Sequence, residues 1–271
     1  MNKLFEGKTG LILGVANKHL LCCGIANALC ASGAELILGY ANDTVGKHVR
    51  ELAEDLGATC LECDVSSDES LDRFFAQVSI NLNGRPLDFV VHRVSCSDKR
   101  ELDGPFLDTS RFDFQLVFDV SVYSLTALCQ RAALLMTNGG SILTLTNLGD
   151  ERVTPNHGVT GVAEAALEAS VRYLAHDLGP AGITVNAISA GPNKTAAAPG
   201  VSGLGSLINW NAMNAPLRRN RTIEEIGDAA LFCLSKLGRC MTGEVLHIDS
   251  GFPTTGIVAR ANKAANEQTM A

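Results

Sequence analysis

Residues 9–24 read TGLILGVANKHLLCCG, a short apolar run that ends in a turn bounded by Gly14 and Gly24. The run from Thr9 to Gly14 predicts a buried strand, and the residues from Gly24 to Ser32 predict a helix. The glycine spacing differs from the common G-x-G-x-x-G pattern of dinucleotide-binding turns. Glycines between a strand and a helix still let the backbone approach a phosphate at the helix N-terminus. The turn therefore indicates either a nucleotide site or a tight connection that binds no ligand.

The rest of the chain repeats this alternation of apolar strands and helices. We predict strands at 35–38, 59–63, 87–92, 141–145, 183–188 and 244–248, and helices at about 43–56, 70–80, 110–136 and 158–178. Strands that alternate with crossover helices form a mainly parallel, doubly wound sheet, here a Rossmann-like α/β fold of about seven strands. No linker-like segment divides residues 1–271, so we expect a single domain, with a frayed tail at about 260–271.

The composition is that of an ordinary globular protein. The 271-residue chain is 46% hydrophobic and has a formal net charge of −7, which argues against nucleic acid or an anionic membrane as its main partner. No run approaches the roughly 20 apolar residues that span a bilayer, so we expect a cytoplasmic protein.

The cysteines and histidines predict no metal site. Nine cysteines without framework spacing indicate reduced thiols. Cys60 and Cys63 form a C-x-x-C pattern, but residues three apart in a strand point to opposite faces. His92 lies within an apolar strand and is expected to belong to the core.

Several stretches resemble one known family. They include VNAISAGP at 185–192, TIEE at 222–225 and GEVLHIDSGF at 243–252, and shorter matches extend over essentially the whole chain. The sequence resembles the bacterial enoyl-acyl-carrier-protein reductases, a divergent branch of the short-chain dehydrogenase/reductases. The resemblance implies an oxidoreductase of fatty acid biosynthesis that uses NADH, with NADPH as an alternative, and forms a homotetramer. It also implies an acyl thioester or acyl-carrier protein as substrate, covered by a mobile segment at about 195–216.

The resemblance assigns residues to the cofactor, although several depart from the family pattern. The cofactor-binding residues that it implies are Gly14, Ala16, Leu20, Leu21, Gly24, Ala41, Asp64, Val65, Val94, Glu164, Asn193, Lys194 and Thr195. Asp64 corresponds to the family residue that accepts a hydrogen bond from the adenine amino group. Leu20 and Leu21 stand where the family has a serine and an isoleucine, so a hydroxyl donor to phosphate is missing. Dinucleotide binding that is weakened or lost is therefore one expectation.

The turn after the fourth predicted strand departs further from the family. It reads Arg93–Val94–Ser95 where the family has Ser–Ile–Gly or a close variant. Small residues there let the backbone approach the cofactor ribose. An arginine would crowd that contact or supply a cation for a different anion, whereas an outward-turned Arg93 would change little. The sequence leaves both interpretations open.

The residues of the reaction centre depart most from the family pattern. Asn147, His157 and Glu164 stand where the family has an auxiliary tyrosine, the catalytic tyrosine and the catalytic lysine. In the family, the catalytic tyrosine hydrogen-bonds the thioester carbonyl during hydride transfer, and the lysine holds the nicotinamide ribose. His157 and Glu164 are seven residues apart, two helical turns, so they lie on one face of a helix. Glu164 reverses the charge of the lysine, which opposes enolate formation, although a carboxylate can accept from two ribose hydroxyls.

Three functions stay open from the sequence. The first is an atypical or repurposed enoyl reductase acting on an acyl thioester or related enone. In it, His157 is the proton donor or carbonyl polariser, Asn147 an auxiliary donor and Glu164 an orienting group. The second is a catalytically inactive homologue that serves as a binding or regulatory subunit, for example in a hetero-oligomer with an active relative. The third is a non-redox isomerase, cyclase or hydratase on the same scaffold, for which the sequence has no positive signature.

Overall fold

Seven parallel strands form one sheet in the computed structural model, which describes residues 3–15, 21–95, 104–147, 152–153, 157–192 and 204–255. The strands are β1 (Thr9–Leu13), β2 (Glu35–Tyr40), β3 (Thr59–Glu62), β4 (Phe89–His92), β5 (Gly140–Thr146), β6 (Ile183–Ala190) and β7 (Val245–Ile248). Their order across the sheet is β3-β2-β1-β4-β5-β6-β7, and all neighbours are parallel. The predicted doubly wound, mainly parallel sheet of about seven strands is confirmed.

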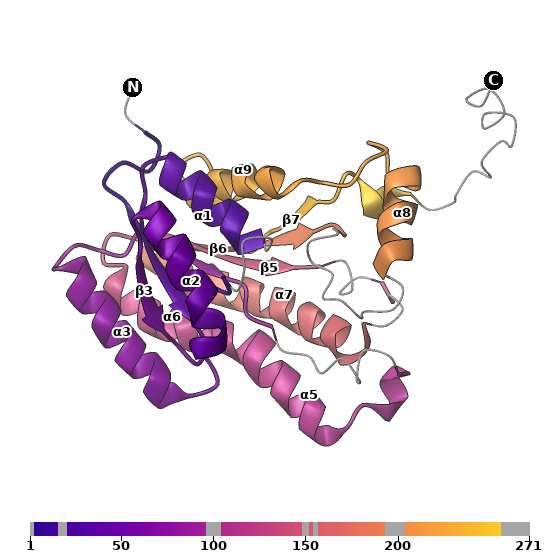
Figure 1. The fold of residues 1–271 in the computed structure, drawn as a ribbon, viewed down its shortest axis with the longest axis horizontal. Coiled ribbons are helices and arrows are strands. Elements are labelled where there is room, and N and C mark those ends of the chain that lie inside the picture. The colour runs from indigo at the N-terminus through magenta and orange to yellow at the C-terminus, as the bar shows by residue number, and fades with distance from the viewer. Residues whose placement is uncertain are drawn as a thin grey trace, which may run out of the picture.

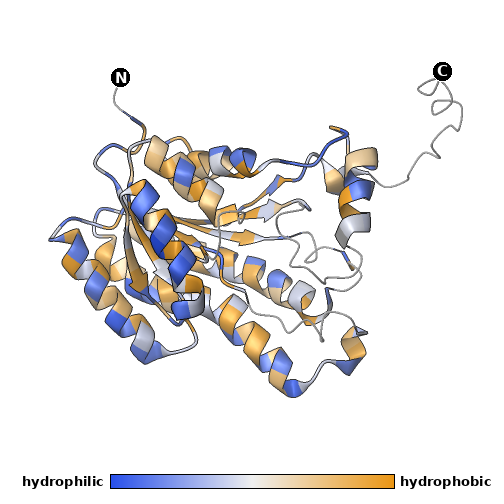
Figure 2. Cartoon of the chain, in the orientation of Figure 1, coloured by the Kyte–Doolittle hydropathy of each residue, from blue (hydrophilic) through white to orange (hydrophobic). Residues whose placement is uncertain are grey.

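Helices cover both faces of the sheet (Figure 1). They are α1 (Leu21–Ala31), α2 (Asp43–Leu56), α3 (Asp68–Leu82), α5 (Arg111–Phe118), α6 (Ser124–Leu135), α7 (Gly158–Leu178), α8 (Leu204–Asn214) and α9 (Ile223–Leu234). One core joins α1, α2 and α9 to the face that carries Ile12 and Val91. A second core joins α3, α6 and α7 to the face that carries Leu11 and Val90. Figure 2 shows the matching pattern, with apolar strands inside and hydrophilic residues on the outer helix faces.

Side-chain caps fix where two of these helices begin. The Asn42 side chain accepts a hydrogen bond from the backbone N–H of Val45 at the start of α2, and this helix ends at Gly57 with φ of 62°. At the start of α9, Thr222 and Glu225 form a reciprocal capping box. These local signals explain why the predicted bounds of α2 agree with the observed ones.

The stretch 111–135 differs from the single helix predicted there. A π-helical segment, Asp119–Tyr123, separates α5 from α6. By length and composition alone, the 25-residue stretch Arg111–Leu135 could cross a membrane, which the sequence analysis did not anticipate. However, Leu125 and Leu128 are fully buried in the core beneath the sheet, as in the core helix of a globular protein.

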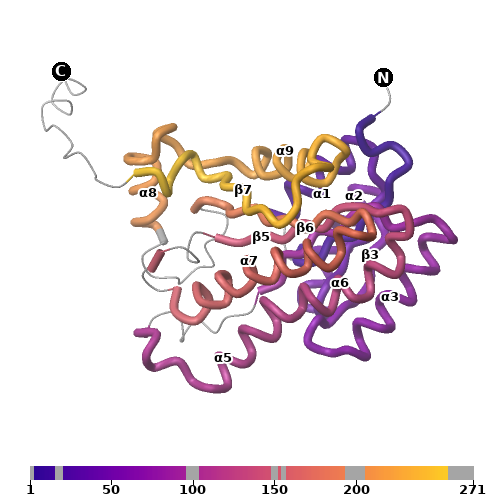
Figure 3. The backbone as a smooth tube through the Cα atoms, turned by 180° about the vertical axis from the view of Figure 1, so that it is seen from behind, coloured from indigo at the N-terminus to yellow at the C-terminus, as the bar shows by residue number. Residues whose placement is uncertain are grey.

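Two helices near the C-terminus, α8 and α9, were not predicted from the sequence. Part of the expected mobile segment forms α8, which stands beyond the carboxyl end of β6 (Figure 3). Ile208 and Asn211 of α8 are buried, and Trp210 packs edge-on against Phe252. The rest of that segment up to residue 203 lies outside the described residues, as does the predicted frayed tail.

His92 ends β4 inside the core, which confirms the sequence prediction. It is 0% exposed, with Nδ1 2.9 Å from Thr144 Oγ1 and Nε2 2.8 Å from Ser124 Oγ. Burial, with a smaller contribution from the charge of Arg93, lowers the pKa of His92 from 6.5 to about 3. The imidazole is therefore neutral in the folded protein at neutral pH.

We expect His92 to make stability depend on pH. Below pH about 6.5 the unfolded chain binds a proton that the folded protein excludes, so the free energy of unfolding falls as pH drops toward about 3. Between about pH 7.5 and about pH 5 the loss is roughly 2 kcal/mol. Urea unfolding at both pH values measures it. His92→Gln should lack this component, and His48→Gln, at an exposed position, should retain it. Equal pH dependence in wild type and His92→Gln would contradict the prediction.

Candidate functional site

The carboxyl ends of β1 and β4 mark the point where the strand order reverses. From β1 the sheet continues to β2 on one side, and from β4 it continues to β5 on the other. Open α/β sheets bind ligands in the crevice at such a point. Gly14 follows β1 with φ of +99°, and a Cβ built on it would lie 1.7 Å from the carbonyl oxygen of Arg93, which follows β4. Position 14 therefore requires glycine.

Asn147, His157 and Glu164 lie together near the carboxyl end of β5. Asn147 directly follows β5, whereas His157 precedes α7 and Glu164 lies within it. Asn147 Nδ2 donates a hydrogen bond to Glu164 Oε1 at 2.5 Å. His157 Nε2 lies 3.7 Å from Glu164 Oε2, which confirms the expectation that these two side chains share one face of the helix.

Glu164 is the buried member of this cluster. It is 5% exposed, whereas the His157 side chain is 30% exposed. Glu164 Oε2 and His157 Nε2 have no hydrogen-bond partner within the described residues, and 3.7 Å is too long for a direct bond between them. Both atoms therefore keep the capacity to bond a third group, such as a hydroxyl or carbonyl of a bound molecule.

Other predicted cofactor residues also follow strands at the carboxyl edge. Ala41 follows β2 and is exposed, and Val94 packs against the core beside β4. Asp64 follows β3 and is exposed, and its Oδ1 accepts hydrogen bonds from the backbone N–H and Oγ of Ser66. Val65 is buried next to it. Their contact with a cofactor stays a prediction.

Gly24 has a different role from the predicted one. It lies within α1, where a Cβ would come 2.2 Å from Ile223 Cγ2 of α9. The glycine allows α1 and α9 to pack closely. Because Gly24 lies inside the helix, the expectation that it shapes the turn is wrong, whereas its contact with a cofactor stays a prediction. Leu21, the first residue of α1, is buried in the same core. The other predicted cofactor residues, Ala16, Leu20, Asn193, Lys194 and Thr195, lie outside the described residues.

Arg221 is a buried cation that the sequence analysis missed. It is 4% exposed, and its Nε donates to the carbonyl of Gly191, just after β6, at 3.1 Å. Burial lowers its pKa to about 10, so it stays charged at neutral pH. Arg221 thereby braces the backbone that leads into the predicted cofactor residues 193–195. Its place in the basic run 218–221 was the only available signal.

The described part of the chain offers no observation in favour of a metal site or a reactive thiol. No group of three or more His, Cys, Asp or Glu side chains there could hold a metal ion. Cys60 packs against one core and Cys63 lies in the other, on opposite faces of the sheet, as expected. Burial raises the pKa of the Cys63 thiol to about 12, which keeps it protonated.

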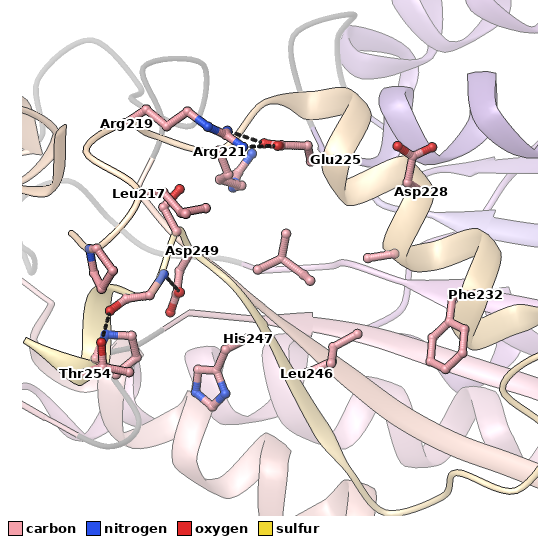
Figure 4. Close-up of a pocket in the computed structure, with 16 residues that line it drawn as sticks. Leu217, Arg219, Arg221, Glu225, Asp228, Phe232, Leu246, His247, Asp249 and Thr254 are labelled. Carbon is pink, nitrogen blue, oxygen red and sulfur yellow. Dashed lines mark hydrogen bonds and ion pairs between the residues drawn. The ribbon is translucent and has the colours of Figure 1, made fainter.

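A separate hollow of about 1090 Å³ lies along β7 and α9 (Figure 4). Figure 4 shows Arg219 paired with Glu225, and Phe232 and Leu246 among the other side chains that line the hollow. None of the predicted catalytic or cofactor residues that the structure describes lines this hollow. It is therefore a different surface from the candidate active site.

The reversed strand order, the glycine turn and the polar cluster define a Rossmann-type protein with a candidate active site at the carboxyl edge of its sheet. The family model described as enoyl-(acyl carrier protein) reductase matches residues 14–253. The chain belongs to this family.

Known relatives match over nearly their whole length. Enoyl-[acyl-carrier-protein] reductase [NADH] 1 of Rhizobium meliloti (strain 1021) is 51% identical over 257 residues, which cover 94% of each chain. The crystal structure of the Anaplasma phagocytophilum reductase in complex with NAD is 50% identical, with a TM-score of 0.91 and coverage of 96% of this chain and 98% of that one. The Bacillus cereus reductase with NADP+ and an indole naphthyridinone is 46% identical, with a TM-score of 0.91 and coverage of 94% and 100%.

We expect Asn147 and Glu164 to be energetically coupled. Asn147→Ala leaves a buried carboxylate oxygen without its donor and should lower the free energy of unfolding by about 2 kcal/mol. In a chain that carries Glu164→Leu, the same change should lower it by less than about 1 kcal/mol. Urea unfolding of the wild type, both single variants and the double variant measures the coupling. Ser170→Ala, on the same helix, should combine additively with Asn147→Ala. Additivity of Asn147→Ala with Glu164→Leu would refute the hydrogen bond.

Proposed function

We propose that this chain is an NADH-dependent reductase of enoyl thioesters in which Asn147, His157 and Glu164 form the catalytic group. The observation that carries the proposal is the arrangement of these side chains at the carboxyl end of β5, with Glu164 bonded to Asn147 and facing His157. The names of relatives, NADH-dependent enoyl-acyl-carrier-protein reductases, support NADH and an acyl-carrier-protein substrate. A cytoplasmic location is part of this proposal.

Two features of the described residues fit a dinucleotide. The first turn of α1 carries no acidic residue, so no carboxylate there repels a phosphate at the helix N-terminus. Glu164 Oε2 is a buried acceptor without a partner, which suits a ribose hydroxyl as donor. When bound, NADH supplies the hydride.

The three side chains take different roles in the proposed reaction. His157, partly exposed, donates a hydrogen bond or a proton to the substrate carbonyl as negative charge develops on its oxygen. Glu164 faces His157 at 3.7 Å and would orient it once the two side chains close to hydrogen-bond distance, whereas Asn147 holds the other oxygen of Glu164 in place. Orientation of a general acid by a fixed carboxylate follows the logic of known catalytic triads.

The charge of Glu164 opposes this chemistry. Two like unit charges about 6 Å apart repel by roughly 3 kcal/mol at an effective dielectric near ~20. A negative Glu164 at that range would slow the formation of an enolate by about two orders of magnitude. A hydrogen bond from His157 to the developing negative oxygen offsets part of this repulsion. We therefore expect turnover that is slow and depends strongly on His157.

We expect NADH oxidation with an enoyl thioester such as crotonyl-acyl-carrier protein. His157→Ala should lower kcat/KM by about 100-fold, since a positioned general acid contributes on that scale. The absorbance of NADH measures the rate. His176→Ala, at an exposed position in the last turn of the same helix, is the matched control and should leave the rate unchanged. A rate that survives His157→Ala removes His157 from the mechanism.

A non-catalytic subunit is the second candidate, because a negative charge at position 164 opposes the formation of an enolate. A chain of this kind would bind an active relative through a shared surface and reduce nothing itself. No turnover by the purified chain, together with co-purification of an active reductase, would establish this function. Turnover by the pure homo-oligomer would exclude it.

The described surface supports the homotetramer proposed from the family resemblance. β7 is an edge strand that pairs only with β6 among the described strands, and the hollow beside it exposes Leu217 and Phe232. A second apolar patch includes Leu107 and Phe112, which are 91% and 70% exposed. A tetramer built as a dimer of dimers needs two different interfaces, and these two patches could supply them.

Light scattering should find a particle of about four times the 28.6 kDa chain mass. Phe232→Asp places a charge in the hollow beside β7 and should reduce the particle to a dimer. Ile80→Asp, at an exposed position on α3 outside both patches, should leave the tetramer intact. A monomeric wild type at micromolar concentration would refute the tetramer.

A further inference from the structure

Strand alternation places Arg93 on the face of the sheet that carries α1. Phe89 and Val91 pack in the core shared with α1 and α9, whereas Val90 packs in the opposite core and His92 bonds Ser124 of α6. The N–H of Arg93 donates to the carbonyl of Leu13 at 3.0 Å, so it continues the ladder between β1 and β4. Since side chains alternate between faces, Arg93 leaves the carboxyl edge on the same side as Phe89 and Val91.

This side also carries the N-terminal end of α1. Cys22, in the first turn of α1, is fully buried, and its Sγ lies 3.9 Å from the carbonyl of Leu13. Burial raises the pKa of the Cys22 thiol to about 12, and the charge of Arg93 partly counteracts this effect. The charge of Arg93 also contributes to the lowered pKa of His92, so both effects agree with a guanidinium near the carboxyl ends of β1 and β4.

Arg93 and the N-terminal end of α1 therefore lie on the same side of the sheet, at its carboxyl edge. The N-terminal end of a helix carries about half a positive charge, and α1 has no acidic residue in its first turn to neutralise it. A guanidinium beside this end is repelled unless an anion lies between them. The buried carboxylate of Glu164 repels an anion from the β5 side of the site, which leaves the α1 side as the favourable position.

We propose that Arg93 binds a phosphate of the dinucleotide in the crevice between β1 and β4, together with the N-terminal end of α1. A guanidinium can bond two phosphate oxygens at once, which a hydroxyl cannot. The inference rests on the dinucleotide-binding part of the proposed function and is independent of turnover. In this chain the cation of the nucleotide site lies at the end of β4, whereas α7 contributes an anion.

Calorimetry with ADP, NADH and adenosine tests the proposal on the full-length chain. Arg93→Gln should weaken binding of ADP and NADH by about tenfold or more, the scale of a charge-assisted hydrogen bond. Adenosine, which lacks phosphate, should bind both proteins equally. Arg85→Gln is the matched control, because Arg85 pairs with Glu35 at the opposite, amino edge of the sheet, at 2.9 and 2.7 Å. It should leave all three affinities unchanged.

Thermal unfolding separates a binding role from a structural one. Without ligand, Arg93→Gln should melt at the wild-type temperature or above it, because the repulsion at α1 is relieved. With ADP, its melting temperature should rise less than that of the wild type. A variant that melts well below the wild type without ligand, and shifts equally with ADP, would assign Arg93 a structural role and overturn the proposal.

The outcomes distinguish this inference from the proposed reductase function. Unchanged or tighter ADP binding by Arg93→Gln overturns the inference even if the wild type reduces enoyl thioesters. Binding of ADP that depends on Arg93, with no turnover, supports the inference and refutes the reductase. A wild type that binds neither ADP nor NADH overturns both.

Discussion

The reversal of strand order between β1 and β4 governs the site. Because the sheet extends in opposite directions from these two strands, the crevice at their carboxyl ends stays open between the helices of the two faces. The backbones meet so closely there that position 14 admits only glycine. This contact fixes the end of β4, and with it the starting point of the Arg93 side chain. The polar cluster on β5 and α7 is held at the same edge by the parallel pairing of β4 with β5.

The replacements at the reaction centre are physically linked to one another. A carboxylate that is 5% exposed needs hydrogen-bond donors, since burying a charge without partners is strongly unfavourable. Asn147 supplies one such donor to Glu164, and His157 faces the other oxygen at 3.7 Å. A lysine at position 164 would require acceptors instead. Asn147, His157 and Glu164 therefore form one polar arrangement rather than three unrelated replacements of the family's side chains.

Local sequence signals predicted the elements that depend on them. The bounds of α2 and α7 follow from a cap, a terminal glycine and regular helical spacing, all of which lie within the segment itself. The π-helical segment was missed because it keeps an apolar pattern close to that of an α-helix. α8 was missed because its glycine and asparagine residues weaken the helical pattern, and its burial depends on contacts with distant residues such as Phe252.

The site also combines features that local sequence signals predict with features that depend on residues far apart in the chain. Helical spacing alone brought His157 and Glu164 together, but the hydrogen bond of Asn147 crosses from a strand to a helix and needed the structure. The packing role of Gly24 was missed because glycine spacing does not reveal which neighbour approaches, here Ile223 of α9. Arg221 and its acceptor Gly191 are 30 residues apart, and they meet because the chain between α8 and α9 returns to the end of β6.

A scaffold that had merely lost its reaction would have no need of a buried carboxylate at position 164. Replacement of a buried charge by an apolar side chain of similar size is often neutral or stabilising, because the desolvation penalty disappears. Glu164 therefore does not follow from the stability of the fold. Its Oε2 has no hydrogen-bond partner among the described residues and lies 3.7 Å from Nε2 of the partly exposed His157. The charge is most simply explained by a bound group that donates to it, and a ribose hydroxyl or a substrate proton would meet that requirement.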